Sequence, residues 1–110
     1  MPADTNPYGG IFGGWLMSQM ALAAGSLASR HSKGKAVVVA ATDLAFPGAM
    51  AVGDELSVYA ELLREGTTSM TIRATATGRE RDSEREFEVA SGTFTFVAVT
   101  ADNEKRALGT

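Results

Sequence analysis

The chain has 110 residues, 45% hydrophobic and 21% charged, a composition typical of one folded domain and not of a disordered chain. Ten lysines and arginines against 13 aspartates and glutamates give a net charge of -3, which excludes an overall basic surface for nucleic acid. The absence of cysteine excludes disulfides, thiolate zinc sites and cysteine nucleophiles, and it suits a reducing cytoplasm.

The beginning of the chain, MPADTNPYGG, has neither a basic segment nor an apolar core, so the sequence predicts no signal peptide. The longest apolar stretch, residues 11–28, is interrupted by glycine, serine and glutamine, which argues against a membrane span. We therefore expect one cytoplasmic domain over residues 1–110, with a core over 1–99 and a polar, frayed tail over 100–110.

Residues 12–30 are predicted to form a helix that is buried on several sides, because apolar residues cover nearly its whole surface. One face carries Phe12, Leu16, Met20, Ala23, Ala24 and Leu27. Arg30 and His31 suit the negative end of the helix dipole, and Gly34 suits its stop. As the only histidine, His31 is interpreted as a solvated capping residue, and no transition-metal site is expected.

Four strands are predicted after the helix, at residues 36–46, 55–65, 70–77 and 87–99, with a charged hairpin tip over 78–86. The first of them is almost continuously apolar, which is typical of a central strand covered on both faces. One helix and one antiparallel sheet predict an α+β domain in which the sheet curves around the helix. Because one sheet cannot cover itself on both faces, we expect a homo-oligomer.

A glycine-rich segment opens the predicted helix, and it consists of Gly9, Gly10, Ile11, Phe12, Gly13 and Gly14. Its spacing matches neither a dinucleotide fingerprint nor a phosphate loop. One interpretation is that unscreened helix N-terminal amides bind an anion or polarise a carbonyl oxygen. The other is that small residues let the helix pack closely inside the sheet, and the residues alone leave both open.

Several segments in order resemble the acyl-CoA thioester hydrolases of the hotdog fold, both the bacterial single-domain acyl-CoA thioesterases and the related cytosolic acyl-CoA hydrolases. They are MPADTNPYGGIFGGWLMSQM, AVVVAATDLAF, VGDELSVYAELL, EGTTSMTI and GTFTFVAV. The resemblance runs from residue 1 to about residue 99 and implies a long central helix wrapped by an antiparallel sheet. It also implies homodimers that pair edge to edge and assemble into a tetramer or hexamer, with active sites between subunits.

The resemblance implies hydrolysis of acyl-CoA to free acid and CoA, with no cofactor beyond the CoA of the substrate and no nucleic-acid or membrane partner. Helix N-terminal amides would hold the thioester carbonyl, Asn6 would order the turn and Thr42 would line the cleft. The implied catalytic set is Asn6, Gly10, Ile11, Gly13, Gly14 and Thr42. The implied CoA-binding set is Gly66, Thr67, Thr68, Ser69, Lys105 and Arg106.

The sequence departs from the family pattern at positions that carry chemistry. Gly10 stands where the family has Asp or Asn, and Ala21 stands where it has a second acid. A missing general base typically costs 10²- to 10⁴-fold in rate, so we expect weak hydrolysis. The alternative is a non-catalytic protein that binds acyl-CoA or another hydrophobic ligand on the same scaffold, and a third reading is a structural subunit beside an active paralogue.

Smaller departures concern binding and the N-terminus. Gly48 and Ala49 replace a cation and a proline, and Thr42 stands where Asn or Asp is common. Asp4 and Asp43 are candidate substitutes for the missing acid, although each is more often structural, as a turn cap and a strand end. The resemblance also implies that Met1 falls inside the family's first strand, so that half of this strand is missing.

Overall fold

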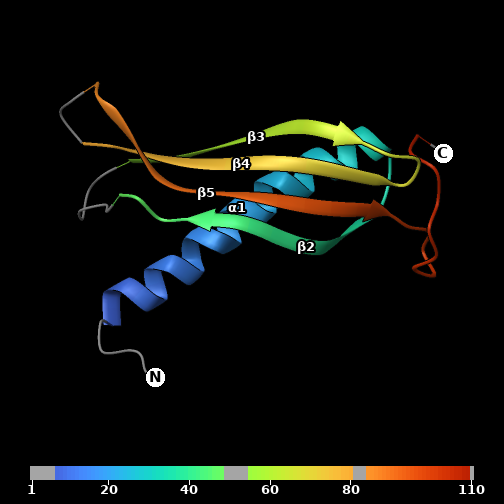
Figure 1. Cartoon of the computed structure of the whole chain (residues 1–110), viewed down its shortest axis with the longest axis horizontal. Helices are drawn as coiled ribbons and strands as arrows, with labels where there is room; N and C mark the ends of the chain where they lie inside the picture. Colours follow the sequence, from blue (N-terminus) through green and yellow to red (C-terminus); the bar gives the residue numbers. More distant parts are fainter. Residues whose placement is uncertain (1–6, 49–54, 81–83, 110) are drawn as a thin grey trace.

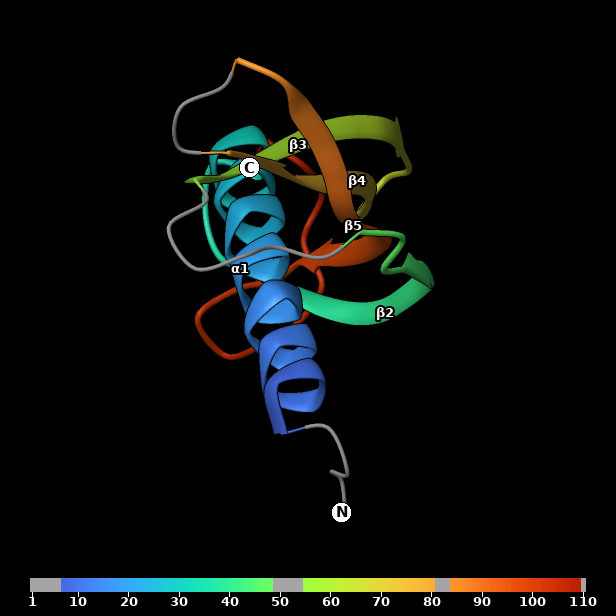
Figure 2. The ribbon, with the colours of Figure 1, turned by 90° about the vertical axis from the view of Figure 1, so that its left-hand side faces the viewer.

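The computed structural model describes residues 7–48, 55–80 and 84–109, and of residues 7–12 it describes the backbone alone. A long helix precedes four strands: α1 (Pro7–Ser32), β2 (Ala36–Ala45), β3 (Glu55–Glu65), β4 (Ser69–Arg79) and β5 (Glu86–Ala98). Figure 1 shows one sheet with the helix crossing a single face of it, and Figure 2 shows the sheet curving around the helix. The predicted α+β class is confirmed.

Helix α1 begins at Pro7, earlier than the predicted start at residue 12. Proline suits the first helical turn because that turn needs no amide donor. At the other end Lys33 adopts a φ of 62°, and the Gly34 N–H donates to the carbonyl oxygen of Ser29 at 3.1 Å. This pattern closes a helix with a left-handed residue, and here that residue is Lys33 and not the glycine.

The sheet is antiparallel throughout, in the order β2-β5-β4-β3. The bounds of β3, β4 and β5 agree with the predicted strands to within two residues. In β4, Met70, Ile72, Ala74 and Ala76 are buried while the threonines and Arg73 of the other face are half-buried, as the alternation predicts. At the start of β3 and the end of β4, Glu55 pairs with Arg79, and its hydrogen bond and charge raise the pKa of Arg79 above the usual value.

The hydrophobic core lies between one face of α1 and the inner face of the sheet. The helix contributes Leu16, Met20, Ala24 and Ala28, four residues apart, and the central strands contribute Phe94, Phe96, Met70 and Ile72. A side chain at Gly25 would lie 3.5 Å from the Phe96 ring, so β5 crosses the helix there at close range. From residue 13 onward this is the one face of α1 that is buried: Trp15 is 45% exposed and Leu22 is 68% exposed, so the prediction of burial on several sides is wrong for a single chain.

Strand β2 is an edge strand, which contradicts the prediction of a central strand covered on both faces. Among the described strands it pairs with β5 alone, and the side chains from Val38 to Ala45 are exposed. Within the described part of the chain the apolar run from Val38 onward is therefore not buried, and Val38, Val39 and Leu44 remain in contact with solvent. A central strand and an edge strand that is covered by another chain have the same hydrophobic pattern, so the sequence alone does not separate them.

The tail is ordered, and the prediction of a frayed segment after residue 99 is wrong. Lys105 forms a β-bridge with Val99. The Thr100 N–H donates to the carbonyl oxygen of Glu104 at 2.7 Å, and the Asn103 N–H donates to that of Thr100 at 2.9 Å, which closes a turn. The Thr100 hydroxyl accepts from the N–H groups of Asp102 and Glu104, while Asn103 adopts a φ of 65°. Such local threonine and asparagine turns hold polar residues in place without a hydrophobic core.

Candidate functional site

The glycine-rich segment is part of the helix and not a turn before it. Because α1 begins at Pro7, the amides of Ile11 to Gly14 lie inside the helix, where each donates to the carbonyl four residues earlier. The donors without such a partner are those of the first turn, the amides of Tyr8 and Gly9. The expected carbonyl-binding amides therefore shift toward the chain start. Gly10 follows them in the same turn, whereas Asn6 lies outside the described residues.

The glycines near the beginning of α1 have open space beside them. A Cβ added at Gly13 or Gly14 would meet no described atom within 4 Å, apart from the backbone of the helix itself. Figures 1 and 2 both show this part of the helix extending beyond the sheet. These glycines therefore do not serve close packing inside the sheet, the second of the two interpretations. Ala21, where the family's second acid is expected, is half-buried and packs against the core.

Thr42 lies on the exposed edge strand β2, in register with Thr93 of β5. The register breaks directly after it, between Thr42 and Ala45, and Asp43 adopts a φ of 53° there. An extra residue in left-handed conformation is a β-bulge, and aspartate tolerates this conformation better than most residues. Asp43 is therefore not simply the end of a strand. It is the bulge residue at which β2 changes direction, next to Thr42.

Gly48 is required by the backbone around it. A Cβ at this position would lie 2.5 Å from the carbonyl oxygen of Glu88, and the Gly48 N–H faces the carbonyl oxygen of Val89 at 3.5 Å. A larger residue here, such as the cation of the family pattern, demands a different path of the chain. Ala49, the second departure in this loop, lies outside the described residues.

The expected CoA-binding residues Gly66, Thr67, Thr68 and Ser69 form a tight turn between β3 and β4. The Gly66 N–H donates to the Ser69 carbonyl oxygen at 2.8 Å. The carbonyl of Thr68 accepts from the Ala98 N–H at 2.8 Å, and that of Thr67 accepts from the Leu108 N–H at 3.0 Å. The turn is therefore anchored to the end of β5 and to the tail, and the structure brings it together with the segment that holds Lys105 and Arg106.

Arg106 is engaged with the protein itself. Its Nε donates to the carbonyl oxygen of Val99 at 2.8 Å, and its Nη1 donates to that of Ser32 at 2.7 Å. Its Nη2 donates to the carbonyl oxygen of Lys35 at 3.0 Å and to the Ser32 hydroxyl at 3.1 Å. We call Arg106 and the surrounding segment 105–109 the C-terminal clamp. The side chain of Lys105 is exposed, so it is the cation of this segment that faces solvent.

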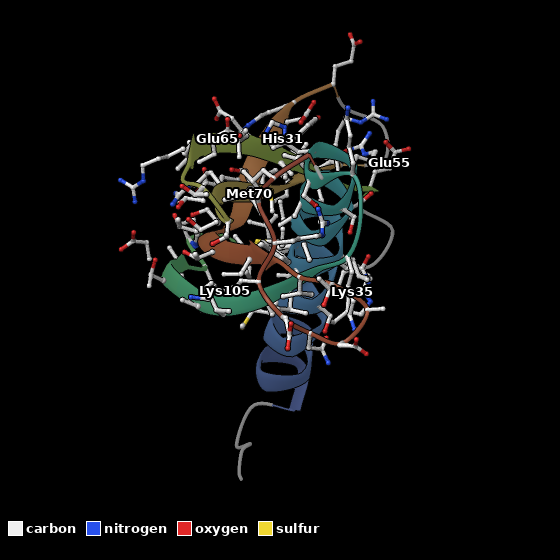
Figure 3. The ribbon with its side chains drawn as sticks, turned by 90° about the vertical axis from the view of Figure 1, so that its right-hand side faces the viewer. His31, Lys35, Glu55, Glu65, Met70 and Lys105 are labelled. Carbon is white, nitrogen blue, oxygen red and sulfur yellow. The ribbon has the colours of Figure 1, made fainter. Side chains whose placement is uncertain are left out.

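His31 does not act as a simple solvated cap, because its Nε2 pairs with the Glu65 carboxylate. The contact joins the end of α1 to the end of β3. Figure 3 views this end of the molecule and shows His31 and Glu65 together on one side, with Lys35 and Lys105 on the other. The pair is exposed, so it contributes little to stability.

The glycine segment and the turn over 66–69 lie at opposite ends of α1. Thr42 lies between these two ends, because it pairs with Thr93 of β5, which pairs with Arg73 of β4, four residues along the strand from Ser69. Strand β2 itself starts beside the clamp and runs away from it (Figure 1). The turn over 66–69 and the clamp belong to the end where the helix stops, since the Gly109 N–H donates to the carbonyl oxygen of Ser32. A helix of 26 residues is about 39 Å long. One chain therefore does not bring the glycine segment and the turn together.

The part of the chain that the structure describes offers neither a metal centre nor a membrane-spanning helix. No group of three or more histidine, cysteine, aspartate or glutamate side chains is placed to hold a metal ion there. No described helix combines the length and the apolar character that crossing a membrane requires.

Comparison with known proteins gives a consistent picture. The family model of the thioesterase superfamily matches residues 8–83. An uncharacterized acyl-CoA thioester hydrolase of Zymomonas mobilis is 46% identical over 102 residues, which cover 93% of this chain and 68% of the relative. The acyl-CoA thioester hydrolase YciA of Escherichia coli is 39% identical over 111 residues, covering 98% of this chain and 84% of the relative.

A solved structure shares the fold as well. The hexameric hotdog fold thioesterase Cj0915 of Campylobacter jejuni superposes with a TM-score of 0.84 at 34% sequence identity. The match covers 99% of this chain and 84% of the other. The hotdog fold implied by the sequence resemblance is thereby confirmed.

Proposed function

The chain belongs to the thioesterase superfamily, and we propose that it hydrolyses acyl-CoA thioesters to a free acid and CoA. The observation that carries this proposal is that relatives named acyl-CoA thioester hydrolases match 93% and 98% of the chain. The similarity therefore extends over the helix start, the edge strand and the tail, the three places from which site residues are expected.

In the proposed reaction the thioester carbonyl oxygen lies at the beginning of α1. The amides of Tyr8 and Gly9, which have no partner within the helix, stabilise the negative charge that develops on this oxygen together with the positive end of the helix dipole. Water adds to the carbonyl carbon, the bond from carbon to sulfur breaks, and the proton released by water ends on the CoA thiol. Because Gly10 and Ala21 carry no carboxylate, no base from these positions accepts the proton in transit, and we expect slow turnover.

The CoA portion is proposed to contact the turn over Gly66, Thr67, Thr68 and Ser69, with Lys105 facing the phosphates. Since these residues lie about a helix length away from the start of α1 in the same chain, one active site would combine residues of two or more chains. We propose a homodimer through the exposed β2 edge, assembling further into a tetramer or hexamer. The exposed Val38, Val39 and Leu44 and the hexameric state of the Campylobacter thioesterase support this arrangement.

The remaining parts of the proposal concern partners and location. Amides, water and substrate suffice for the reaction, so we propose no cofactor other than the CoA of the substrate. The net charge of -3 supports the absence of a nucleic-acid partner. We propose a cytoplasmic location, which the lack of cysteine supports.

Release of free thiol from a panel of acyl-CoA esters of increasing chain length tests the activity. Gly9→Pro removes one amide donor in the first helical turn, where proline is tolerated, and should lower kcat by about 10²-fold. Gly9→Ala keeps the donor and is the matched control, so its kcat should stay near that of the wild type. A wild-type protein that binds acyl-CoA by calorimetry but releases no thiol contradicts hydrolysis and identifies a ligand-binding protein instead.

A further inference from the structure

The C-terminal clamp joins three elements that are distant in the sequence. Through one guanidinium group it binds the carbonyl oxygens of Ser32 at the end of α1, Lys35 before β2 and Val99 after β5. A planar guanidinium fixes several acceptors in one geometry, which a lysine ammonium does not. The relative position of these three chain ends therefore depends on Arg106.

Gly34 leaves the space in which this guanidinium lies. A Cβ at Gly34 would be 2.7 Å from Nη2 of Arg106 and 3.1 Å from its Cζ. Gly34 has no positive φ, because the left-handed residue at this helix end is Lys33. The glycine therefore serves the close approach of the arginine and not the turn of the backbone.

The clamp also reaches the turn over residues 66–69. The Arg106 N–H donates to the Ala98 carbonyl oxygen at 3.0 Å, and two residues later the Leu108 N–H donates to that of Thr67 at 3.0 Å. The Ala98 N–H in turn donates to the Thr68 carbonyl oxygen. Two of the four turn residues thus have their carbonyl groups held by the residues that Arg106 keeps in place.

We propose that Arg106 is a positioning residue that sets the turn over residues 66–69 for binding of the CoA portion, and does not itself contact the CoA phosphates. The inference rests on the proposed function only in assigning this turn to CoA. It replaces the expectation that Arg106 binds CoA directly, because four donor contacts of its guanidinium go to acceptors of the protein. Lys105 remains the cation for a direct phosphate contact.

Two variants disturb the clamp in different ways, and both are made in the full chain. Arg106→Lys keeps the positive charge but loses the fork of donors, whereas Gly34→Ala keeps the arginine and displaces its guanidinium. We expect each to raise KM for an acyl-CoA about tenfold, equally at low and high salt, with kcat unchanged. The exposed Arg64→Lys is the matched control, and Lys105→Ala should raise KM at low salt only.

The outcomes separate the alternatives. Direct phosphate contact by Arg106 is indicated if Gly34→Ala leaves KM unchanged while Arg106→Lys raises it in a salt-dependent way, and this overturns the proposal. Unchanged KM in both variants overturns it as well. If wild-type protein releases no thiol, the proposed function fails, but dissociation constants for CoA measured by calorimetry on the same folded proteins still test the clamp. Circular dichroism of each variant checks that it is folded. If Arg106→Lys does not fold, the test is made with Gly34→Ala alone.

Discussion

The two ends of α1 differ in how completely the chain satisfies them. Where the helix stops, Lys33 adopts a left-handed conformation, the Gly34 N–H donates to the carbonyl oxygen of Ser29, and the clamp arginine donates to that of the fully buried Ser32. Where it begins, Gly13 and Gly14 face open space and Trp15 stays half exposed. We call the end around Ser32, where carbonyl groups have partners, the finished end of α1. The end around Gly13 and Gly14, where the surface is open, is the unfinished end.

This difference indicates where a second chain belongs. An end that already satisfies its backbone and buries its side chains gains little from a partner, whereas a bare glycine-rich end beside an exposed apolar edge strand gains much. The glycines at the two ends also differ. A Cβ at Gly34 would collide with the Arg106 guanidinium, whereas a Cβ at Gly13 would meet no described atom within 4 Å outside the helix backbone.

The largest effect is expected at the finished end. Arg106→Ala removes charge-assisted hydrogen bonds to three backbone carbonyls and should lower the free energy of unfolding by about 3 kcal/mol. Urea denaturation followed by circular dichroism measures it, with Arg64→Ala as the exposed control. A loss no larger than that of the control contradicts the view that this end is held by the clamp.

At the unfinished end the main expected change is in rate. Gly10→Asp restores a carboxylate in the first turns of α1 and should raise kcat by about 10²-fold if the rest of the site is intact. Gly10→Ala adds a side chain without a polar group and serves as its control. Thiol release under saturating acyl-CoA measures both, and equal rates for Asp, Ala and wild type would show that the departure involves more than position 10.

A smaller effect compares the glycines directly. Gly13→Ala should stabilise the isolated chain by up to about 1 kcal/mol, because alanine favours helix and meets no neighbour, whereas Gly34→Ala should destabilise it. Unfolding is measured at dilutions below and above the assembly concentration. Destabilisation by Gly13→Ala that appears only in the assembled protein would place a partner surface at the helix start.

The smallest effect concerns the bulge of β2, which lies between the two ends of α1. Asp43→Gly should raise the free energy of unfolding by about 0.5 kcal/mol, because glycine adopts the positive φ without strain. Asp43→Asn retains tolerance for this conformation and should be neutral. If both variants fold normally but lose turnover, the carboxylate acts in catalysis in place of the acid missing at position 10.

Periodicity and one continuous apolar run predicted the helix and all four strands, because the core residues are local and regular. Met70 to Ala76 alternate with threonines, and Leu16, Met20 and Ala24 recur every four residues, so each pattern reports its own element. The place of β2 was not predictable in this way, since its apolar run depends on what lies outside the chain. The start of α1 was set too late because glycines weaken the helix signal, although Pro7 marks it.

The site was predicted less fully than the fold. The glycine segment was identified from the residues alone, whereas Thr42 and the turn over residues 66–69 were identified through the resemblance, and the roles of all three remain predictions. The engagement of Arg106 was missed because its partners are backbone carbonyls of three distant segments, which leave no trace in local sequence. The one signal in the sequence was Gly34. It was interpreted as the residue that ends the helix, but Lys33 is the left-handed residue there, and the glycine instead leaves space for the Arg106 guanidinium.

The contact between Gly34 and Arg106 makes these two positions dependent on each other. A side chain at position 34 does not fit the present position of the Arg106 guanidinium, because a Cβ there would lie 2.7 Å from Nη2 and the guanidinium would have to move. A chain of this fold that gains alanine at position 34 should therefore lose less when Arg106 is replaced by a shorter residue than this chain does. Single substitutions at either position will overstate the cost of changing both, and a random library selected for folding should recover them as a pair.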